Sequence, residues 1–307
     1  MRIVFFGTPE FALPSLEALL AEGAQVVGVV TQPDKAQGRS RSVLVPSPIK
    51  QLADRHALPV LQPERPAGDV FLAALRHWHP EIGIVVAYGH LLKPEVLGLP
   101  SRGMLNVHAS LLPRLRGAAP INWAILEGDA ETGISIMQME AGLDSGPVLR
   151  HSATPIGGDE NSGELHARLA RLGAETLVET LALMRLGRLT PVAQDPALAT
   201  YAPKIDRRVT RIDWRETAGA VARRIRAFDP APGAWGLLGD REVKCFGARV
   251  SEGTGRPGEV LATESGLLVA TGHGAVAIAE VQPAGRGRMR AEAWSRGRGA
   301  QAGQLLQ

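Results

Sequence analysis

The first half of the chain alternates short apolar runs with segments of helical periodicity. The runs are rich in β-branched and aromatic residues, and they occupy residues 2–6, 26–30, 82–87 and 104–107. The first helical pattern follows the turn Gly7-Thr8-Pro9 and ends at Gly23. Continuous apolar strands that alternate with helices are typical of a parallel sheet covered on both faces. The pattern therefore predicts a doubly wound, mostly parallel α/β domain at the N-terminal end.

The second half follows a different pattern. A helix is expected over residues 163–186, after which periodicity fades and Pro191, Pro196 and Pro203 accumulate. One amphipathic helix is then expected, followed by several short strands between glycine-rich turns. These elements are expected at 216–228, 242–246, 258–263, 266–271 and 275–281. We predict a catalytic domain over residues 1–189, a linker over 190–204 and a small β-barrel domain over 205–307.

Length and composition set limits on the function classes. A chain of 307 residues favours two domains, and its single cysteine excludes an internal disulfide and a cysteine-built zinc site. The histidines have no metal-ligand spacing, so we expect no metal. No apolar run is long enough to cross a bilayer, and an apolar strand begins directly after Met1, which leaves no room for a signal peptide. We therefore expect a cytoplasmic protein without membrane contact, and nothing in the sequence demands more than a monomer.

Charge is distributed unevenly between the two halves. Residues 1–200 hold 17 Lys and Arg against 20 Asp and Glu, whereas residues 201–307 hold 17 against 11. A basic segment of about a hundred residues suits a polyanion such as nucleic acid. Arginine-rich composition without a binding role explains the same numbers, so charge alone leaves both interpretations open.

Residues 106–120 hold the densest group of candidate functional side chains. Asn106 and His108 lie two apart at a predicted strand end, so both side chains can leave the same face of the sheet. An amide and an imidazole there suit an oxygen that gains negative charge, and Asp144, between two glycines, can orient the histidine or accept a proton. Each feature also has a structural explanation, as a capped strand end or an Asx-turn. Together they point to transfer of a small acyl group.

Two other kinds of enzyme chemistry lack support. Neither Ser110 nor Cys245 has a partnered base in its sequence context, so no nucleophile stands out. The turn at Gly7 lacks the G-x-G-x-x-G spacing of a dinucleotide site, which argues against a dehydrogenase.

The same residues carry a resemblance to a known family. Asn106, His108, Asp144 and the run from Ser110 to Pro120 resemble the signature of the folate-dependent formyltransferases. Further motifs, spread along nearly the whole chain, resemble one branch of it, the methionyl-tRNA formyltransferases. These motifs are Phe6-Gly-Thr-Pro-Glu-Phe11, Thr31-Gln-Pro-Asp34, Pro46-Ser-Pro48, Val86-Ala-Tyr-Gly89, Arg211-Ile-Asp-Trp214 and Arg224-Ile-Arg-Ala-Phe228.

The resemblance implies a fold and a reaction. It implies a Rossmann-like N-terminal domain and an OB-fold-like C-terminal barrel that binds tRNA. The implied reaction moves the formyl group of 10-formyltetrahydrofolate to the α-amino group of methionine on initiator tRNA. The implied catalytic residues are Asn106, His108 and Asp144. The residues implied for folate binding are Ser110, Leu111, Leu112 and Pro113.

The loop at residues 34–42 resembles the basic insertion of the family, which implies tRNA contacts for Arg39 and, less directly, for Arg41. Related enzymes formylate glycinamide ribonucleotide or amino sugars, or hydrolyse the donor. A non-catalytic tRNA- or folate-binding module is the alternative of a different class. The basic loop, the basic second half and Arg211-Ile-Asp-Trp214 favour tRNA as acceptor, and the intact trio favours an enzyme.

Overall fold

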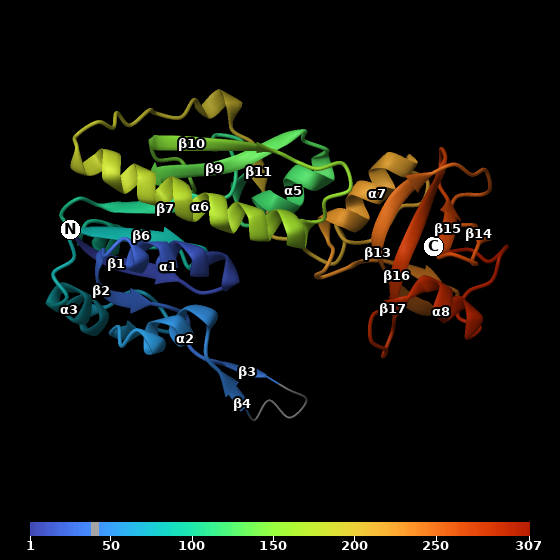
Figure 1. The fold of residues 1–307 in the computed structure, drawn as a ribbon, viewed down its shortest axis with the longest axis horizontal. Helices are drawn as coiled ribbons and strands as arrows, with labels where there is room; N and C mark the ends of the chain where they lie inside the picture. Colours follow the sequence, from blue (N-terminus) through green and yellow to red (C-terminus); the bar gives the residue numbers. More distant parts are fainter. Residues whose placement is uncertain (38–42) are drawn as a thin grey trace. The chain divides into compact units, whose positions relative to one another are not determined.

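The computed structural model describes residues 1–37 and 43–307, and the chain forms two compact units (Figure 1). The first unit consists of residues 1–117, 133–154 and 166–201. The second consists of residues 118–132, 155–165 and 202–307. Each unit thus consists of three separate stretches of the chain, whereas the predicted division at residues 190–204 separates the chain at one place. That division stays a prediction about which parts fold independently.

The first unit is built on a seven-stranded sheet with the order β10-β9-β7-β6-β1-β2-β5. Its strands are β1 (Arg2–Gly7), β2 (Gln25–Val30), β5 (Val60–Leu61), β6 (Ile82–Val86), β7 (Met104–His108), β9 (Glu131–Gln138) and β10 (Val148–Pro155). The pairs from β5 through β7 are parallel, and β9 runs antiparallel to β7. The predicted mostly parallel, Rossmann-like sheet is confirmed.

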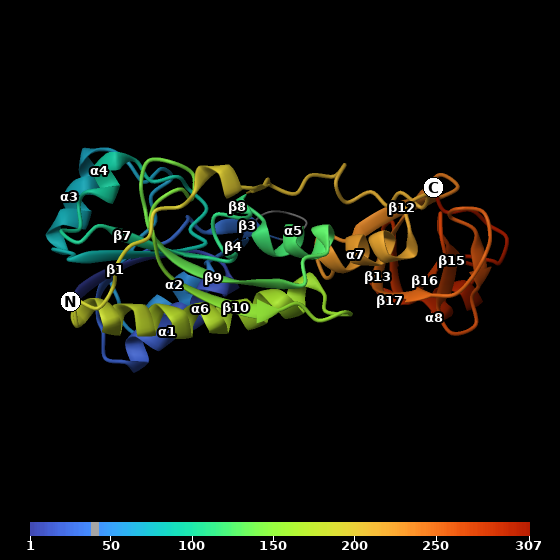
Figure 2. The same cartoon turned by 90° about the horizontal axis from the view of Figure 1, so that it is seen from above.

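Helices cover both faces of this sheet (Figure 2). One face carries α1 (Leu13–Ala21), α2 (Pro48–Arg55) and α6 (Ser162–Arg185), and the other carries α3 (Asp69–His77) and α4 (Pro94–Leu97). A short 3-10 helix, η1 (Glu10–Ala12), leads into α1. Under α3 and α4, Val4 and Phe6 of β1 pack with Leu75 and Tyr88 in a buried cluster. Burial of both faces explains why β6 is fully apolar and buried along its length.

The two arginines of the predicted basic loop, Arg39 and Arg41, lie outside the described residues. The strands on either side of that loop, β3 (Lys35–Gln37) and β4 (Val43–Val45), pair antiparallel. None of the helices in residues 1–37 and 43–307 combines the length and the apolar character that crossing a bilayer requires.

The second unit is an antiparallel sheet with the order β12-β13-β16-β15-β14, and β17 pairs with β16. Its elements are α5 (Pro120–Glu127), α7 (Ala218–Ala227), β12 (Ala234–Leu238), β13 (Arg241–Ser251), β14 (Val260–Ala262), β15 (Leu267–Ala270), β16 (Ala275–Pro283), β17 (Met289–Arg290) and α8 (Ala291–Arg296). At the C-terminus, Leu305 pairs with Glu259 and Leu306 with Leu238, so the last residues connect the two ends of the sheet. The predicted OB-fold-like barrel is confirmed, with β12 as a strand that the sequence pattern missed.

Residues 190–204 contain short structured elements rather than a featureless connection. Val192 pairs with Val148, a 3-10 helix η2 spans Pro196–Leu198, and β11 (Tyr201–Ala202) pairs with β8 (Arg116–Gly117). Within the first unit, residues 192–201 therefore run beside the loop that follows β7.

Candidate active site

The turns after β1, β2 and β6 are joined by hydrogen bonds at the carboxyl edge of the parallel strands. The Thr8 hydroxyl and the Gln32 side-chain amide both donate to the carbonyl oxygen of Tyr88, at 3.0 and 3.1 Å. Beside them, the Gln62 amide and the Lys50 ammonium bond the Asp34 carboxylate and hold its pKa below the ordinary value. Ligands of doubly wound sheets bind at this edge. The family-like motifs at residues 6–11, 31–34 and 86–89 thus meet where a substrate is expected.

Strand β7 places Asn106 and His108 on one face of the sheet, as their spacing predicts. Asn106 lies between Val85 and Met137 on the neighbouring strands and is half-buried, while the His108 side chain is buried. Within residues 1–37 and 43–307, the side-chain amide of Asn106 makes no hydrogen bond. A half-buried amide without a protein partner is available to a ligand oxygen.

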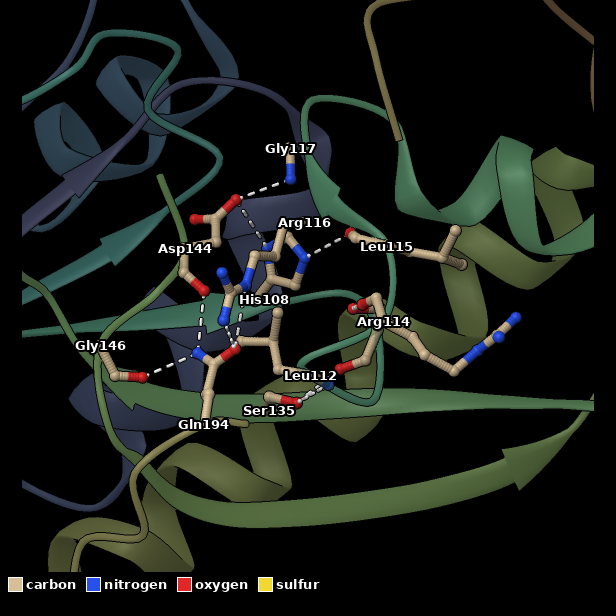
Figure 3. A network of polar contacts seen from close by, with 11 residues as sticks. His108, Leu112, Arg114, Leu115, Arg116, Gly117, Ser135, Asp144, Gly146 and Gln194 are labelled. Carbon is tan, nitrogen blue, oxygen red and sulfur yellow. Dashed lines mark hydrogen bonds and ion pairs between the residues drawn. The ribbon is translucent and has the colours of Figure 1, made fainter. Parts of the chain in front are cut away.

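The two ring nitrogens of His108 face different partners (Figure 3). Nε2 lies 3.0 Å from the carbonyl oxygen of Leu115, and Nδ1 lies 3.7 Å from Oδ2 of Asp144. A carbonyl oxygen only accepts hydrogen bonds, so Nε2 carries a hydrogen and donates it to Leu115. Nδ1 is therefore the nitrogen left to exchange a proton or to bond a substrate. The sequence alone did not indicate which nitrogen the backbone would occupy.

Asp144 lies in the turn between β9 and β10, and its carboxylate points toward His108 (Figure 3). Oδ2 accepts a hydrogen bond of 2.8 Å from the backbone N–H of Gly117. The residue has φ +47°, in the left-handed region that side chains other than Asn, Asp and Gly rarely adopt. Backbone strain of this kind persists only where surrounding contacts hold it. The structure thus brings the three predicted catalytic side chains to one place.

The segment Ser110–Pro113 is hydrogen-bonded to Ser135 of β9. The Ser135 hydroxyl donates to the carbonyl oxygen of Ser110 at 2.6 Å and accepts from the N–H of Leu112 at 3.0 Å. Ser110 and Leu112 are buried, whereas Leu111 and Pro113 are half-buried. Of the four predicted folate residues, Leu111 and Pro113 thus keep some exposed apolar surface, and Ser110 and Leu112 are the two that bond Ser135.

Ser135 also lies 2.9 Å from Nδ1 of His151, a contact that superficially suggests a serine nucleophile with its base. The single hydroxyl hydrogen is already directed at the Ser110 carbonyl, so His151 acts as donor toward Ser135 rather than as its base. Ser135 is fully buried. It is a structural support of the 110–113 segment.

We expect Ser135→Ala to loosen the 110–113 segment. The substitution leaves the Leu112 N–H and the Ser110 carbonyl without their partner, which should lower the free energy of unfolding by about 1–3 kcal/mol. The KM for the formyl donor should rise while the KM for the acceptor stays near its normal value. Urea unfolding and steady-state kinetics measure these effects. The matched control is Thr132→Val on the same strand, because the buried Thr132 hydroxyl has no hydrogen-bond partner among the residues that the structure describes; an equal loss in both variants would contradict this prediction.

Gln194 joins the site although the sequence pattern assigned it to a linker. Its side-chain amide lies between the buried Arg116 and the turn that holds Asp144 (Figure 3). Nothing in its proline-rich, aperiodic surroundings marks it as part of a site. Only the packing of residues 192–200 against the loop after β7 brings it there.

The remaining reactive groups lie elsewhere. Cys245 is fully buried in β13 of the second unit, and burial raises the pKa of its thiol to about 12, which leaves it inert at neutral pH. Among the residues that the structure describes, no group of three His, Cys, Asp or Glu side chains converges as a metal site.

Two family models match the chain, that of the formyl transferases over residues 1–181 and that of the formyl transferase C-terminal domain over residues 204–299. A methionyl-tRNA formyltransferase of Citrifermentans bemidjiense is 45% identical over 307 residues, which cover 100% of this chain and 96% of the relative. This chain belongs to the methionyl-tRNA formyltransferase family. Another member of the family, from Stutzerimonas stutzeri, is 48% identical over 93% of this chain and 91% of its own length.

Solved structures share the fold at lower identity. A structure of HypX from Aquifex aeolicus in complex with tetrahydrofolic acid is 22% identical and has a TM-score of 0.68. The match covers 95% of this chain and 46% of HypX. At this identity the likeness shows only that the two chains share a fold.

Proposed function

We propose that this chain transfers the formyl group of 10-formyltetrahydrofolate to the α-amino group of methionine on initiator tRNA, with Asn106, His108 and Asp144 as catalytic residues. One observation carries the proposal. A carboxylate lies 3.7 Å from the free ring nitrogen of a buried histidine, on the same sheet face as an amide with no partner among the described residues. The transferred formyl group and the tRNA acceptor are inferred from membership of the family.

The reaction is attack of a neutral amine on a formyl carbon. The nitrogen lone pair forms the new C–N bond, and the electrons of the C=O double bond move onto the oxygen. The amine loses one proton. The oxyanion then collapses, the bond between the carbon and N10 of the donor breaks, and that nitrogen takes up a proton. A site for this reaction must stabilise the oxyanion and exchange protons with both nitrogens.

Asn106 and His108 are placed to stabilise the oxyanion. The Asn106 amide donates an N–H to the formyl oxygen, and a proton on Nδ1 of His108 supplies the second donor. Leu115 and the fixed strand β7 hold the imidazole so that no reorganisation is needed when negative charge develops. Each preorganised donor contributes about 3–4 kcal/mol to the stabilisation of the transition state.

Asp144 is placed to handle the proton that the amine loses. Its Oδ2 is bonded by the Gly117 N–H and lies beside Nδ1 of His108, while its side chain stays 15% exposed. Partial exposure leaves room for a water molecule or the amine itself beside the carboxylate. The proton passes to Asp144 directly or through such a water molecule.

We assign donor binding to Ser110, Leu111, Leu112 and Pro113. The half-buried Leu111 and Pro113 offer apolar contacts, and the bonds to Ser135 keep this segment rigid beside the catalytic side chains. The tetrahydrofolic acid bound to HypX, a structure of the same fold, agrees with a folate donor.

We assign tRNA binding to Arg39 and Arg41 and to the arginine and lysine side chains that the second unit contributes from residues 202–307. In that unit the guanidinium groups of Arg207 and Arg211 lie 4.1 and 5.5 Å from the ring centroid of Trp235. If cationic side chains bind tRNA phosphates, the logarithm of the affinity should fall linearly with the logarithm of the salt concentration. We expect a loss of at least about tenfold between 50 and 200 mM KCl, measured by filter binding with the full-length chain. Salt-independent affinity would contradict this role of the basic residues.

A formylation assay tests the proposed function. Purified protein, 10-formyltetrahydrofolate and initiator tRNA charged with methionine should give formylmethionyl-tRNA. A nucleotide-linked amino sugar and glycinamide ribonucleotide serve as alternative acceptors in parallel reactions. Formylation of either small acceptor without formylation of the charged tRNA would refute the proposal.

A further inference from the structure

Gln194 makes four side-chain hydrogen bonds, two to the turn that contains Asp144 and two to Arg116, in the loop whose backbone bonds His108 and Asp144 (Figure 3). Its Nε2 donates to the carbonyl oxygens of Asp144 and Gly146, at 2.8 and 2.7 Å. Its Oε1 accepts from Nε and Nη2 of Arg116, at 3.1 and 2.7 Å. One side chain therefore connects the turn 144–146 with the loop 115–117.

The bonds of Arg116 give this amide a single orientation. A guanidinium can only donate and the two carbonyls can only accept, so the amide oxygen must face Arg116 and the nitrogen must face the turn. Arg116 is buried, and no carboxylate of the described residues forms an ion pair with it. The cation therefore polarises the Gln194 amide and strengthens the two hydrogen bonds that the amide donates.

The two carbonyl oxygens that accept from Gln194 belong to Asp144 itself and to Gly146 in the same turn. Asp144 has φ +47°, a strained backbone conformation from which the turn would relax if nothing held it. Relaxation would rotate the Cα–Cβ bond and move the carboxylate away from Nδ1 of His108. The Gly117 N–H bonds the carboxylate and not the backbone, so among the described residues Gln194 is the side chain that donates hydrogen bonds to the backbone of this turn.

The loop 115–117 is also bonded to Thr200, which lies in the same segment as Gln194. The backbone N–H of Leu115 donates to the hydroxyl of Thr200, and that of Arg116 donates to the carbonyl of Thr200. This loop supplies the Leu115 carbonyl that orients His108 and the Gly117 N–H that bonds Asp144. Residues 194 and 200 thus position both partners of the His108–Asp144 contact.

We propose that Gln194 is a positioning residue for the formyl transfer, which holds the Asp144 carboxylate against His108 by clamping the turn 144–146 to Arg116. The inference rests on the proposed role of Asp144. Gln194 bonds the backbone of Asp144 and none of the three proposed catalytic side chains, so its effect on turnover passes through that backbone.

Two substitutions in the full-length protein separate the halves of this clamp. Gln194→Met keeps the volume of the side chain and removes all four hydrogen bonds. Gln194→Glu keeps acceptors for Arg116 but has no N–H for the carbonyls of Asp144 and Gly146. Val192→Ala is the matched control, because Val192 lies in the same segment, pairs through its backbone and has a side chain that is 64% exposed.

We expect kcat for formylation to fall about 10- to 100-fold in both Gln194 variants, because a displacement of about 1 Å in a reacting group has an effect of this size. The KM values for donor and tRNA should stay within about twofold, and Val192→Ala should match the wild type. In an Asp144→Asn background, Gln194→Met should cause no further loss, because the two residues act as one unit. Thermal unfolding of each variant is measured alongside.

Three outcomes would overturn the inference. The first is a kcat of Gln194→Met within about twofold of the wild type. The second is a further loss in the Asp144→Asn background equal to the loss in the wild-type background, which indicates a general structural effect. The third is full activity of Gln194→Glu, which would transfer the role to the contact with Arg116 alone. Failure of the wild-type protein to formylate tRNA would refute the proposed function instead and is scored separately.

Discussion

Asp144→Asn should reduce kcat for formylation by about 10²–10⁴, the range that a positioned acid or base contributes. The amide keeps the size of the side chain and an oxygen that can accept from the Gly117 N–H, so the turn should stay in place. What is lost is the negative charge beside Nδ1 of His108 and the acceptor for the amine proton. Single-turnover formylation with saturating donor and charged tRNA measures the chemical step.

The same variant should bind tRNA as tightly as the wild type, because Asp144 is assigned to chemistry and not to recognition. Glu140→Gln is the control for the change in charge, since Glu140 lies in the same loop and is exposed. We expect that control to retain normal turnover. An Asp144→Asn variant with unchanged single-turnover rate would remove Asp144 from the catalytic group.

The second large effect is expected for Asn106. Asn106→Ala removes one of the two proposed oxyanion donors, and loss of such a donor typically costs about 10²–10³ in kcat. The side-chain amide has no hydrogen-bond partner among the residues described, so its removal breaks no internal hydrogen bond, and the melting temperature should stay close to that of the wild type. Kinetics and thermal unfolding together therefore separate a catalytic role from a structural one.

Asn106→Asp tests the hydrogen-bond donor specifically. Aspartate has nearly the shape of asparagine, but it presents only acceptors and adds negative charge where an oxyanion forms. We expect this variant to be at least as impaired as Asn106→Ala. Recovery of activity in Asn106→Asp would show that shape, and not donation of an N–H, is what position 106 supplies.

The parallel part of the fold could be predicted from the sequence because its signal is local. Strands β1, β2, β6 and β7 are largely buried, and apart from Arg2, Gln25, Asn106 and His108 they consist of apolar residues and glycine, so they are recognisable as short runs. Strands β9 and β10 lie toward one end of the sheet, and β10 alternates buried or half-buried with exposed positions. Their mixed composition gave no clear run, and the pattern missed them.

The site divides in the same way. Asn106 and His108 could be predicted to share a face because a strand has a period of two residues, and chemistry together with the family resemblance selected Asp144 as their partner. The contact of 3.7 Å between Asp144 and His108 depends on a turn with positive φ, on the Gly117 N–H and on Gln194. None of these three follows from local sequence preference.

The amino-acid sequence by itself determined the class of the two folds, the family and the identity of the three proposed catalytic side chains, because periodicity and motif spacing are properties of neighbouring residues. Only the tertiary structure decided which nitrogen of His108 is bonded to the backbone, that Ser135 bonds the 110–113 segment, and that Gln194 belongs to the site. Each of these depends on a hydrogen bond between groups that are not neighbours in the sequence, from 7 residues apart for His108 and Leu115 to 78 for Arg116 and Gln194. Such bonds form only after the sheet and the segment 192–200 have packed together.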